Sequence, residues 1–272
     1  KEEMLEYLNR VELAYDEKTN EIVAPTFRHD IFRTADLAEE VARFYGYDNI
    51  PTTLPKGEAT TGKLPFDLRI QQTARDMAEF NGFSQGYCYS FESPKVFDKL
   101  LLPADDPHRQ AIVIANPLGE DFSIMRTLSL NGMLTSLGTN YKRRNKNVRL
   151  YELGNIYIPK SLPLTELPEE RMIFTLGMYG DGDFYSMKGV VEEFLDKIGM
   201  RSKEDYDPNS GKTYLHPGRQ ANIIYEGTVL GYLGEVHPTV AASYGIGDRA
   251  YVAVLDMPSI MKFATFDRKY EG

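Results

Sequence analysis

Four acidic residues near the start of the chain are spaced so that they could bind a metal ion. Asp36, Glu39 and Glu40 fall in one predicted helix, and Asp30 precedes that helix by a short extended segment. Residues three and four apart share a helix face, and carboxylate oxygens are the ligands that Mg²⁺ and Ca²⁺ prefer. Acids in a first helical turn also stabilise the helix dipole without any ion. The spacing leaves both explanations open and by itself favours capping.

A second cluster is basic and lies in the middle of the chain. Lys142-Arg143-Arg144-Asn145-Lys146 is followed closely by Arg149. These cations could complement the dipole at the end of a predicted helix over 128–142, or they could contact the phosphates of RNA or of a nucleotide. The chain has 31 Lys and Arg against 40 Asp and Glu, a net charge of −9. Because such a chain does not coat nucleic acid by charge alone, any RNA contact must be local.

Other reactive groups are sparse. The only cysteine is Cys88, so no disulfide can form within the chain, and a reducing, cytoplasmic setting is expected. The four histidines are His29, His108, His216 and His237, and their scatter predicts no zinc site. No Gly-x-Ser-x-Gly motif and no glycine-rich phosphate loop occurs, so neither a hydrolase triad nor a nucleotide-binding loop is predicted.

The predicted elements divide the chain into two units. A helix over 36–45 has Asp36 as its expected N-cap and Gly46 just beyond its end. It follows a predicted hairpin over 11–24 in a small N-terminal unit, residues 1–55. The Pro- and Gly-rich stretch that contains residues 56–64 is typical of a linker. The larger unit comprises residues 65–272.

The larger unit is predicted to be α+β. Its strands occur singly or as hairpins with helices between them, which favours an antiparallel sheet flanked by helices over a doubly wound parallel sheet. We expect helices over 66–80, 94–101, 128–142 and 187–198, and strands over 85–91, 111–115, 148–158, 171–179, 220–225, 228–236 and 250–256.

Three groups of motifs together cover nearly the whole chain. The first is Ala24-Pro25-Thr26-Phe27-Arg28-His29-Asp30-Ile31 with Asp36-Leu37-Ala38-Glu39-Glu40-Val41-Ala42-Arg43-Phe44-Tyr45-Gly46-Tyr47-Asp48-Asn49-Ile50-Pro51. The second is Asn116-Pro117-Leu118-Gly119-Glu120-Asp121 with Met125-Arg126-Thr127, Asn140 to Arg144 and Val148 to Gly154. The third is His216-Pro217-Gly218-Arg219 with Gly231 to Pro238. These motifs resemble one family, the large (β) subunit of bacterial phenylalanyl-tRNA synthetase: the first group is similar to the fifth domain of that subunit, and the other two are similar to its catalytic-like module.

The resemblance implies a fold, a function and partners. Residues 1–55 would be a winged-helix-like module that carries Mg²⁺ ligands, and residues 65–272 an inactive class II synthetase core. The family enzyme attaches phenylalanine to tRNA(Phe) with ATP, as a heterotetramer of two small α and two large β subunits. ATP and phenylalanine would bind on the α subunit. The family's Mg²⁺ ligands fall on Asp30, Asp36, Glu39 and Glu40, which turns the balance from capping toward a metal site.

The sequence also predicts that this core is not itself catalytic. Class II chemistry needs one arginine on a strand for the ATP α-phosphate and a second at the end of a Gly-rich strand. The predicted strand 250–256 has neither glycine nor arginine, and Arg149 and Glu152 are explained by pairing and packing. Two alternatives stay open: a free-standing Mg²⁺-dependent enzyme that uses the four acids, and a nucleic-acid-binding module suggested by the basic cluster and by residues 1–50.

Overall fold

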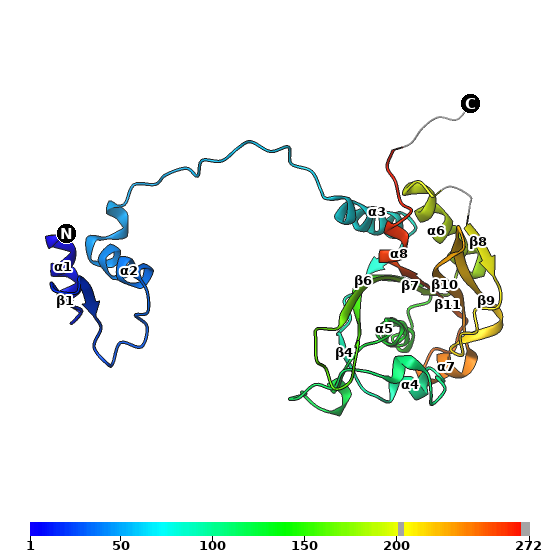
Figure 1. The fold of residues 1–272 in the computed structure, drawn as a ribbon. Coiled ribbons are helices and arrows are strands. Elements are labelled where there is room, and N and C mark those ends of the chain that lie inside the picture. The colour runs from blue at the N-terminus through cyan, green and yellow to red at the C-terminus, as the bar shows by residue number, and fades with distance from the viewer. Residues whose placement is uncertain (201–203, 268–272) are drawn as a thin grey trace. The chain divides into compact units, whose positions relative to one another are not determined.

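The chain folds into two compact units. A computed structural model describes residues 1–200 and 204–267, and it divides the chain into Lys1–Gly62 and Lys63–Gly272 (Figure 1). The boundary falls inside the predicted linker 56–64, and residues 51–65 have no helix or strand and are exposed. No helix within these described residues is long and apolar enough to cross a membrane.

The first unit is a hairpin between two helices. Its elements are α1 (Glu2–Asn9), β1 (Ala14–Asp16), β2 (Glu21–Val23), α2 (Thr34–Tyr45) and a 3-10 turn, η1 (Tyr47–Asn49). β1 and β2 pair antiparallel. α1 packs against α2, with the rings of Tyr7 and Phe44 stacked 6.0 Å apart.

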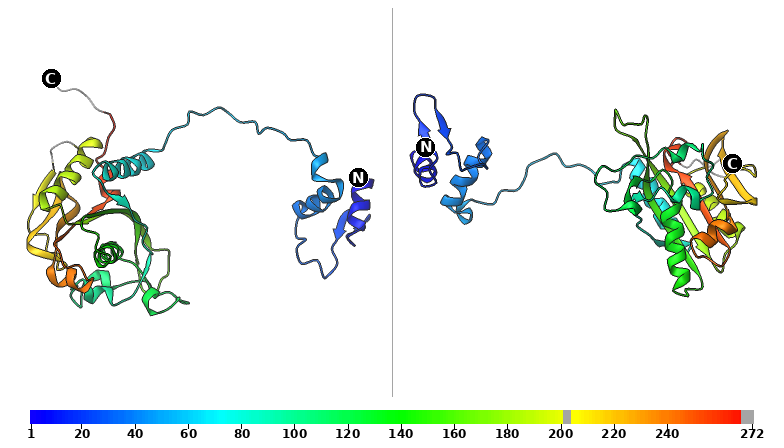
Figure 2. Two further views of the ribbon diagram at one scale, coloured as in Figure 1. Left: turned by 180° about the vertical axis from the view of Figure 1, so that it is seen from behind. Right: turned by 90° about the horizontal axis from the view of Figure 1, so that it is seen from below.

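The second unit is built on a seven-stranded sheet (Figure 2). Neighbouring strands pair antiparallel, except that Ser84–Gln85 pairs parallel with the strand that contains Leu150 and Tyr151. In spatial order the strands are β3 (Ser84–Gln85), β6 (Val148–Ile158), β7 (Glu169–Tyr179), β11 (Ala250–Asp256), β10 (Thr228–Val236), β9 (Leu215–Tyr225) and β8 (Glu204–Asp207). A separate short ribbon joins β4 (Phe91–Glu92) to β5 (Ile124–Met125).

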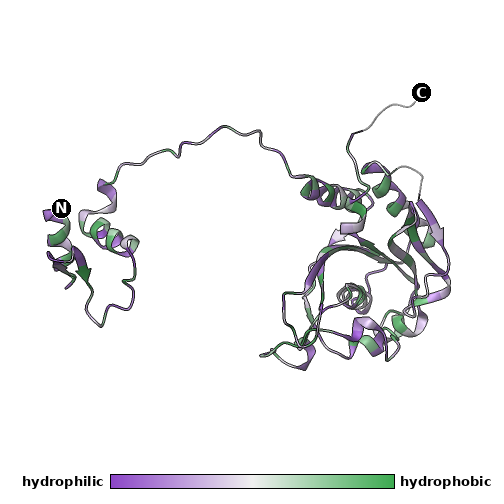
Figure 3. Cartoon of the chain, in the orientation of Figure 1, coloured by the Kyte–Doolittle hydropathy of each residue, from purple (hydrophilic) through white to green (hydrophobic). Residues whose placement is uncertain are grey.

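Helices cover both faces of this sheet, because its central strands are apolar on both sides. Figure 3 shows hydrophobic residues along these strands. In β11, Ala253 and Leu255 belong to one core and Val252 and Val254 to the other. The first core is completed by α3 (Phe66–Phe80), α6 (Phe184–Lys197) and α8 (Met257–Met261), and the second by α4 (Val96–Lys99), α5 (Leu130–Lys142) and α7 (Pro238–Ser243).

α5 lies directly on its face of the sheet. A Cβ atom placed on Gly177 of β7 would lie 2.7 Å from Cγ of Met133. Glycine at this position therefore permits the close approach of helix and strand. The side chains of α5 pack directly on this part of the sheet.

The long elements and the short N-terminal hairpin of β1 and β2 agree with the sequence predictions, whereas several other short elements differ. The hairpin between β9 and β10 is confirmed: its turn residues Glu226 and Gly227 have φ of 47° and 78°, the left-handed conformation of a tight hairpin turn. The predicted strand 111–115 is wrong apart from one bridge from Val113 to Ile124. Of the predicted strand 85–91, only the two ends are in strands, as parts of β3 and β4. β8 was not predicted, and the β3–β6 pair makes the sheet mixed rather than purely antiparallel.

Candidate functional site

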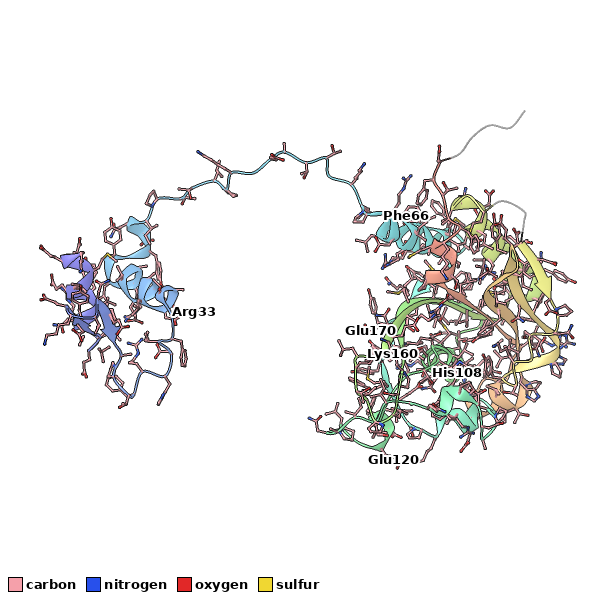
Figure 4. The ribbon with its side chains drawn as sticks, in the orientation of Figure 1. Arg33, Phe66, His108, Glu120, Lys160 and Glu170 are labelled. Carbon is pink, nitrogen blue, oxygen red and sulfur yellow. The ribbon has the colours of Figure 1, made fainter. Side chains whose placement is uncertain are left out.

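Asp36 acts as a helix cap, although not at the position predicted from the sequence. Its Oδ2 accepts the backbone N–H groups of Phe32 and Arg33 at 2.8 and 2.9 Å, and these hydrogen bonds hold the pKa of Asp36 below its usual value. α2 begins at Thr34 with Arg33 as the N-cap residue (Figure 4). The carboxylate therefore reaches back from the first turn, as in a capping box, and the expectation that Asp36 is the N-cap is wrong.

Arg28 holds two of the other acids. Its Nη2 lies 2.6 Å from Oδ2 of Asp30 and 3.0 Å from Oε1 of Glu40, and its Nε donates to Oδ1 of Asp30 at 2.9 Å. Arg43 donates to Oε2 of Glu40 at 2.6 Å. Arg43 and then Arg28 lower the pKa of Glu40, and Arg28 lowers that of Asp30 to about 2. Both acids are therefore ionised partners of arginine at neutral pH.

This arrangement does not fit a metal ligand set. The guanidinium of Arg28 lies between Asp30 and Glu40 and pairs with both. Oδ2 of Asp36 already accepts backbone N–H groups, and Glu39 lies at an exposed position of α2. Among residues 1–200 and 204–267, no three His, Cys, Asp or Glu side chains gather closely enough to hold a metal ion. Arg28 supplies the positive charge that a cation would bring, and the sequence spacing could not reveal this.

Every arginine on the described strands of the sheet is in an ion pair. Arg171 on β7 makes a two-pronged contact with Asp256, at 2.7 and 2.8 Å, and Asp256 also caps α8 through the N–H of Ser259. Arg149 on β6 lies 3.2 Å from a carboxylate oxygen of Asp181, and Arg219 on β9 is bound to a glutamate of β10. The structure agrees with the expectation that pairing explains Arg149.

A buried ion pair links two segments of the second motif group, since it joins Arg126, which follows β5, to Glu152 on β6. Nη1 of Arg126 lies 3.1 and 3.2 Å from the two carboxylate oxygens of Glu152, and its Nε donates to the carbonyl of Asn155 at 2.7 Å. Arg126 is 3% exposed and Glu152 is 4% exposed. Sequence reasoning gave Arg126 no role. The signal that could have found it is a charged residue beside the hydrophobic segments that become β5 and α5.

The lone cysteine lies next to this pair. The Cys88 N–H donates to Oε1 of Glu152 at 3.2 Å. Burial, and then the Glu152 charge, raises the pKa of the Cys88 thiol to about 11. Because the thiolate is the nucleophile, such a thiol is unreactive at neutral pH. Cys88 is therefore a packing residue.

A second buried carboxyl group lies on the α5 side of the molecule. Glu92 is 4% exposed, and its Oε2 accepts a hydrogen bond from the amide of Asn131 at 3.0 Å. The hydroxyl of Tyr244 in turn donates a hydrogen bond to Oδ1 of Asn131 at 2.9 Å. Oε1 of Glu92 has no hydrogen-bond partner among the residues that the structure describes, and burial raises the pKa of Glu92 to about 7.

An exposed apolar surface, which we call the aromatic corner, surrounds the β4–β5 ribbon. It comprises Tyr89, Phe91 and Val113. Tyr89 is 75% exposed and Val113 is 73% exposed. The ring of Tyr89 packs edge-on against Phe122 at 5.7 Å, and Val113 bridges to Ile124 of β5. Large apolar side chains gathered on a surface are typical of a protein interface. Sequence reasoning did not identify this corner, because exposure cannot be read from residue type.

The basic cluster forms a turn at the end of α5. Lys142 is the last residue of the helix, and Arg143, Arg144 and Lys146 follow it in exposed positions. The structure thus keeps these cations together, as the sequence indicated, and leaves them on the surface.

The comparisons with known proteins point to one family. Residues 50–257 match the family model described as phenylalanyl tRNA synthetase beta chain CLM domain, and residues 1–47 match the tRNA synthetase B5 domain. The phenylalanine–tRNA ligase beta subunits of Clostridium acetobutylicum and Clostridium tetani are 43% and 40% identical to the whole chain. The chain spans 34% of the length of each of these relatives.

A solved structure supports the fold. The pyrrolysyl tRNA synthetase PylSc of Desulfitobacterium hafniense matches 71% of this chain and 67% of its own, with a TM-score of 0.56 and 14% sequence identity. At that identity the likeness establishes the arrangement of the elements and nothing about the chemistry. The sheet flanked by helices is therefore one that a tRNA synthetase also uses.

Proposed function

Because the chain belongs to the phenylalanyl-tRNA synthetase β-chain family, we propose that it is a non-catalytic scaffold of phenylalanine–tRNA ligase. In this role it supports the α subunit, on which ATP and phenylalanine bind, during the attachment of phenylalanine to tRNA(Phe). The assembly is proposed to contain two α and two β subunits. A cytoplasmic location is part of the proposal, because it suits a chain whose only cysteine is free.

The pairing of the strand arginines is the observation that carries this proposal. An adenylate-forming transition state needs fixed positive charge directed at its phosphates. β11 has no arginine and no glycine, and Arg171 beside it is neutralised by Asp256. A sheet without an available cation can support a partner but cannot hold ATP for reaction. This also disfavours a free-standing enzyme on that sheet.

The aromatic corner is the surface that we propose for contact with the α subunit. Replacing Tyr89 and Val113 together by aspartate puts two charges into a surface that must be desolvated on binding. We expect the affinity for the α subunit to fall by about 100-fold or more, since an apolar anchor contributes about 2 kcal/mol or more. Size-exclusion co-elution and calorimetric titration of the full chain with the purified α subunit measure this change.

A matched variant controls for added charge. Tyr185 of α6 is a similarly exposed tyrosine, 76% exposed, outside the aromatic corner, and Tyr185→Asp is expected to leave binding unchanged. If wild-type chain and α subunit do not co-elute at micromolar concentration, the scaffold proposal fails. If they do and the corner variant binds equally well, only the assignment of this surface fails.

Mg²⁺ at Asp30, Asp36, Glu39 and Glu40 in the assembled enzyme stays a prediction, and it requires Arg28 to leave Asp30 and Glu40. Arg28→Gln removes the competing cation, so we expect the full chain to bind Mn²⁺, used as a paramagnetic substitute for Mg²⁺, about tenfold more tightly. Electron paramagnetic resonance of free Mn²⁺ measures the affinity. Arg10→Gln, which removes an exposed arginine bound to Glu6, is the control. Equal affinity of all three proteins would show that these acids are not the ligands.

A further inference from the structure

We infer that a basic surface at the C-terminal end of α5 binds the phosphate backbone of RNA. The basic surface consists of the turn after α5 and two arginines of the neighbouring strands and loops. The inference deepens the proposed function by giving this chain its own RNA contact, and it rests on that function only for the choice of tRNA as the RNA. The residues of the basic surface are Lys142, Arg143, Arg144, Lys146, Arg219 and Arg249.

The cations of the turn are unpaired within the described residues. Lys142, Arg143, Arg144 and Lys146 are exposed, and none makes an ion pair there. Capping of α5 does not require their charges. The N–H groups of Arg143, Arg144 and Asn145 already bond the last carbonyls of the helix, at 2.9 to 3.2 Å. The dipole of α5 acts only within its last turn, so it does not account for cations beyond that turn.

The turn is held in one conformation. Arg144 has a φ of 65°, in the left-handed region that glycine or asparagine enters more easily. The hydroxyl of Tyr179 donates to the carbonyl of Asn145 at 2.8 Å, and the Asn145 amide donates to Asn140 at 2.7 Å. A strained arginine held this way presents its guanidinium from a fixed backbone, and such strain is common at binding sites.

Two further arginines extend the basic surface across a neighbouring hollow of about 490 Å³. Nη1 of Arg219 lies 3.0 Å from both oxygens of Glu235, a carboxylate whose side chain is 5% exposed, and Nε of Arg249 lies 4.0 Å from it. Two guanidinium groups thus share one buried carboxylate. Asp248 also lines the hollow, so the hollow carries no net charge and the excess positive charge of the basic surface lies in the turn. Pro238 and Gly247 are among the other residues that line the hollow.

The turn and the hollow are continuous. A Cβ placed on Gly245 would lie 2.5 Å from Cε of Lys142, and one placed on Gly247 would lie 2.6 Å from the hydroxyl of Tyr141. The segment 245–249 therefore lies against the end of α5. Besides Glu235, two acids are close to this surface. Asp248 accepts the N–H of Arg249 at 2.7 Å, and Asp181 is bound to Arg149.

The composition of the basic surface favours RNA over an acidic protein. None of the large apolar residues that are exposed in the described chain lies in 138–149, 216–219 or 235–249. Protein interfaces depend on buried aromatic or aliphatic anchors at their centre, and this surface offers none. Phosphate contacts need only clustered lysine and arginine side chains. In an acidic chain, this cluster gathers the cations that phosphate contacts require.

The test compares two triple variants of the full chain that lose the same charge. The test variant carries Arg143→Gln, Arg144→Asn and Lys146→Gln, with asparagine chosen because it tolerates the left-handed conformation. The control carries Lys63→Gln, Lys95→Gln and Lys160→Gln, which are exposed lysines of the same unit. Fluorescence anisotropy with a fluorescein-labelled tRNA(Phe) transcript gives the affinity between about 50 and 200 mM KCl. Circular dichroism checks that each variant is folded.

We expect the test variant to bind tRNA about tenfold or more weakly than wild type at low salt, with a plot of log affinity against log salt shallower by about 2 to 3. The control is expected to stay within about twofold. The inference is overturned if wild type does not bind, if both variants lose affinity equally, or if the test variant keeps tRNA affinity but loses the α subunit. The scaffold proposal is tested separately, and it fails if the wild-type chain does not co-elute with the α subunit.

Discussion

Replacing Arg126 by methionine is expected to lower the free energy of unfolding of residues 63–272 by about 3–5 kcal/mol. The substitution leaves the Glu152 carboxylate buried, with the N–H of Cys88 as its remaining donor. A buried charge without a partner costs far more than the pair contributes when it is intact. Because the Arg126 side chain also joins the β4–β5 ribbon to β6, through its Nε to the carbonyl of Asn155 at 2.7 Å, the variant should bind the α subunit more weakly.

The double variant Arg126→Met with Glu152→Met separates charge from packing. It removes both ions, so most of the lost stability is expected to return, to within about 1–2 kcal/mol of wild type. Urea unfolding followed by near-ultraviolet circular dichroism of the tyrosines measures all three proteins. If the double variant were as unstable as the single one, the loss of stability would come from cavity formation and not from the unpaired buried carboxylate of Glu152.

Glu92→Gln is expected to stabilise the protein at pH 8 by about 3 kcal/mol and to have little effect at pH 5. The folded state raises the pKa of Glu92 to about 7, whereas an unfolded glutamate titrates near its ordinary value of 4.5. For an acid whose pKa is raised by folding, the stabilising contribution is complete below the unfolded pKa and is lost as the pH rises through the folded one. The wild type should therefore lose stability between about pH 4.5 and pH 7, and glutamine should remove this loss.

The measurement is the free energy of unfolding of wild type and Glu92→Gln at a series of pH values from 5 to 8. Glu58→Gln, an exposed position in the linker, controls for the change in net charge. Identical pH dependence in wild type and Glu92→Gln would contradict the assignment, because it would place the titrating group elsewhere.

The sequence predicted the elements that local chemistry determines. The hairpin of β9 and β10 follows from Glu226-Gly227 and alternating apolar residues, and helix α3 from its apolar spacing and the glycine after it. The short pieces β3, β4, β5 and β8 are strands only because of what they pair with. Pairing partners distant in sequence leave no local pattern, so such strands cannot be read from one sequence.

The candidate site was predicted less completely than the fold. Spacing placed Asp36 and Glu40 near each other, but it could not show that Arg28, twelve residues before Glu40, supplies the opposing charge. The basic cluster was visible in the sequence, whereas its continuity with Arg219 and Arg249 depends on how 245–249 packs on α5. Charge clusters can be read from the sequence, but which charges neutralise one another depends on the tertiary structure.

The central claim is that this sheet lacks the groups that activate an amino acid, so that it acts through a partner. Phenylalanine-dependent exchange of pyrophosphate into ATP tests it, measured with the chain alone, with the α subunit alone, and with both together. We predict no exchange by the chain alone, and exchange wherever the α subunit supplies an active centre. Exchange catalysed by the chain in the absence of the α subunit would contradict the claim, because it would require phosphate-binding cations that Asp256 and Asp181 already neutralise.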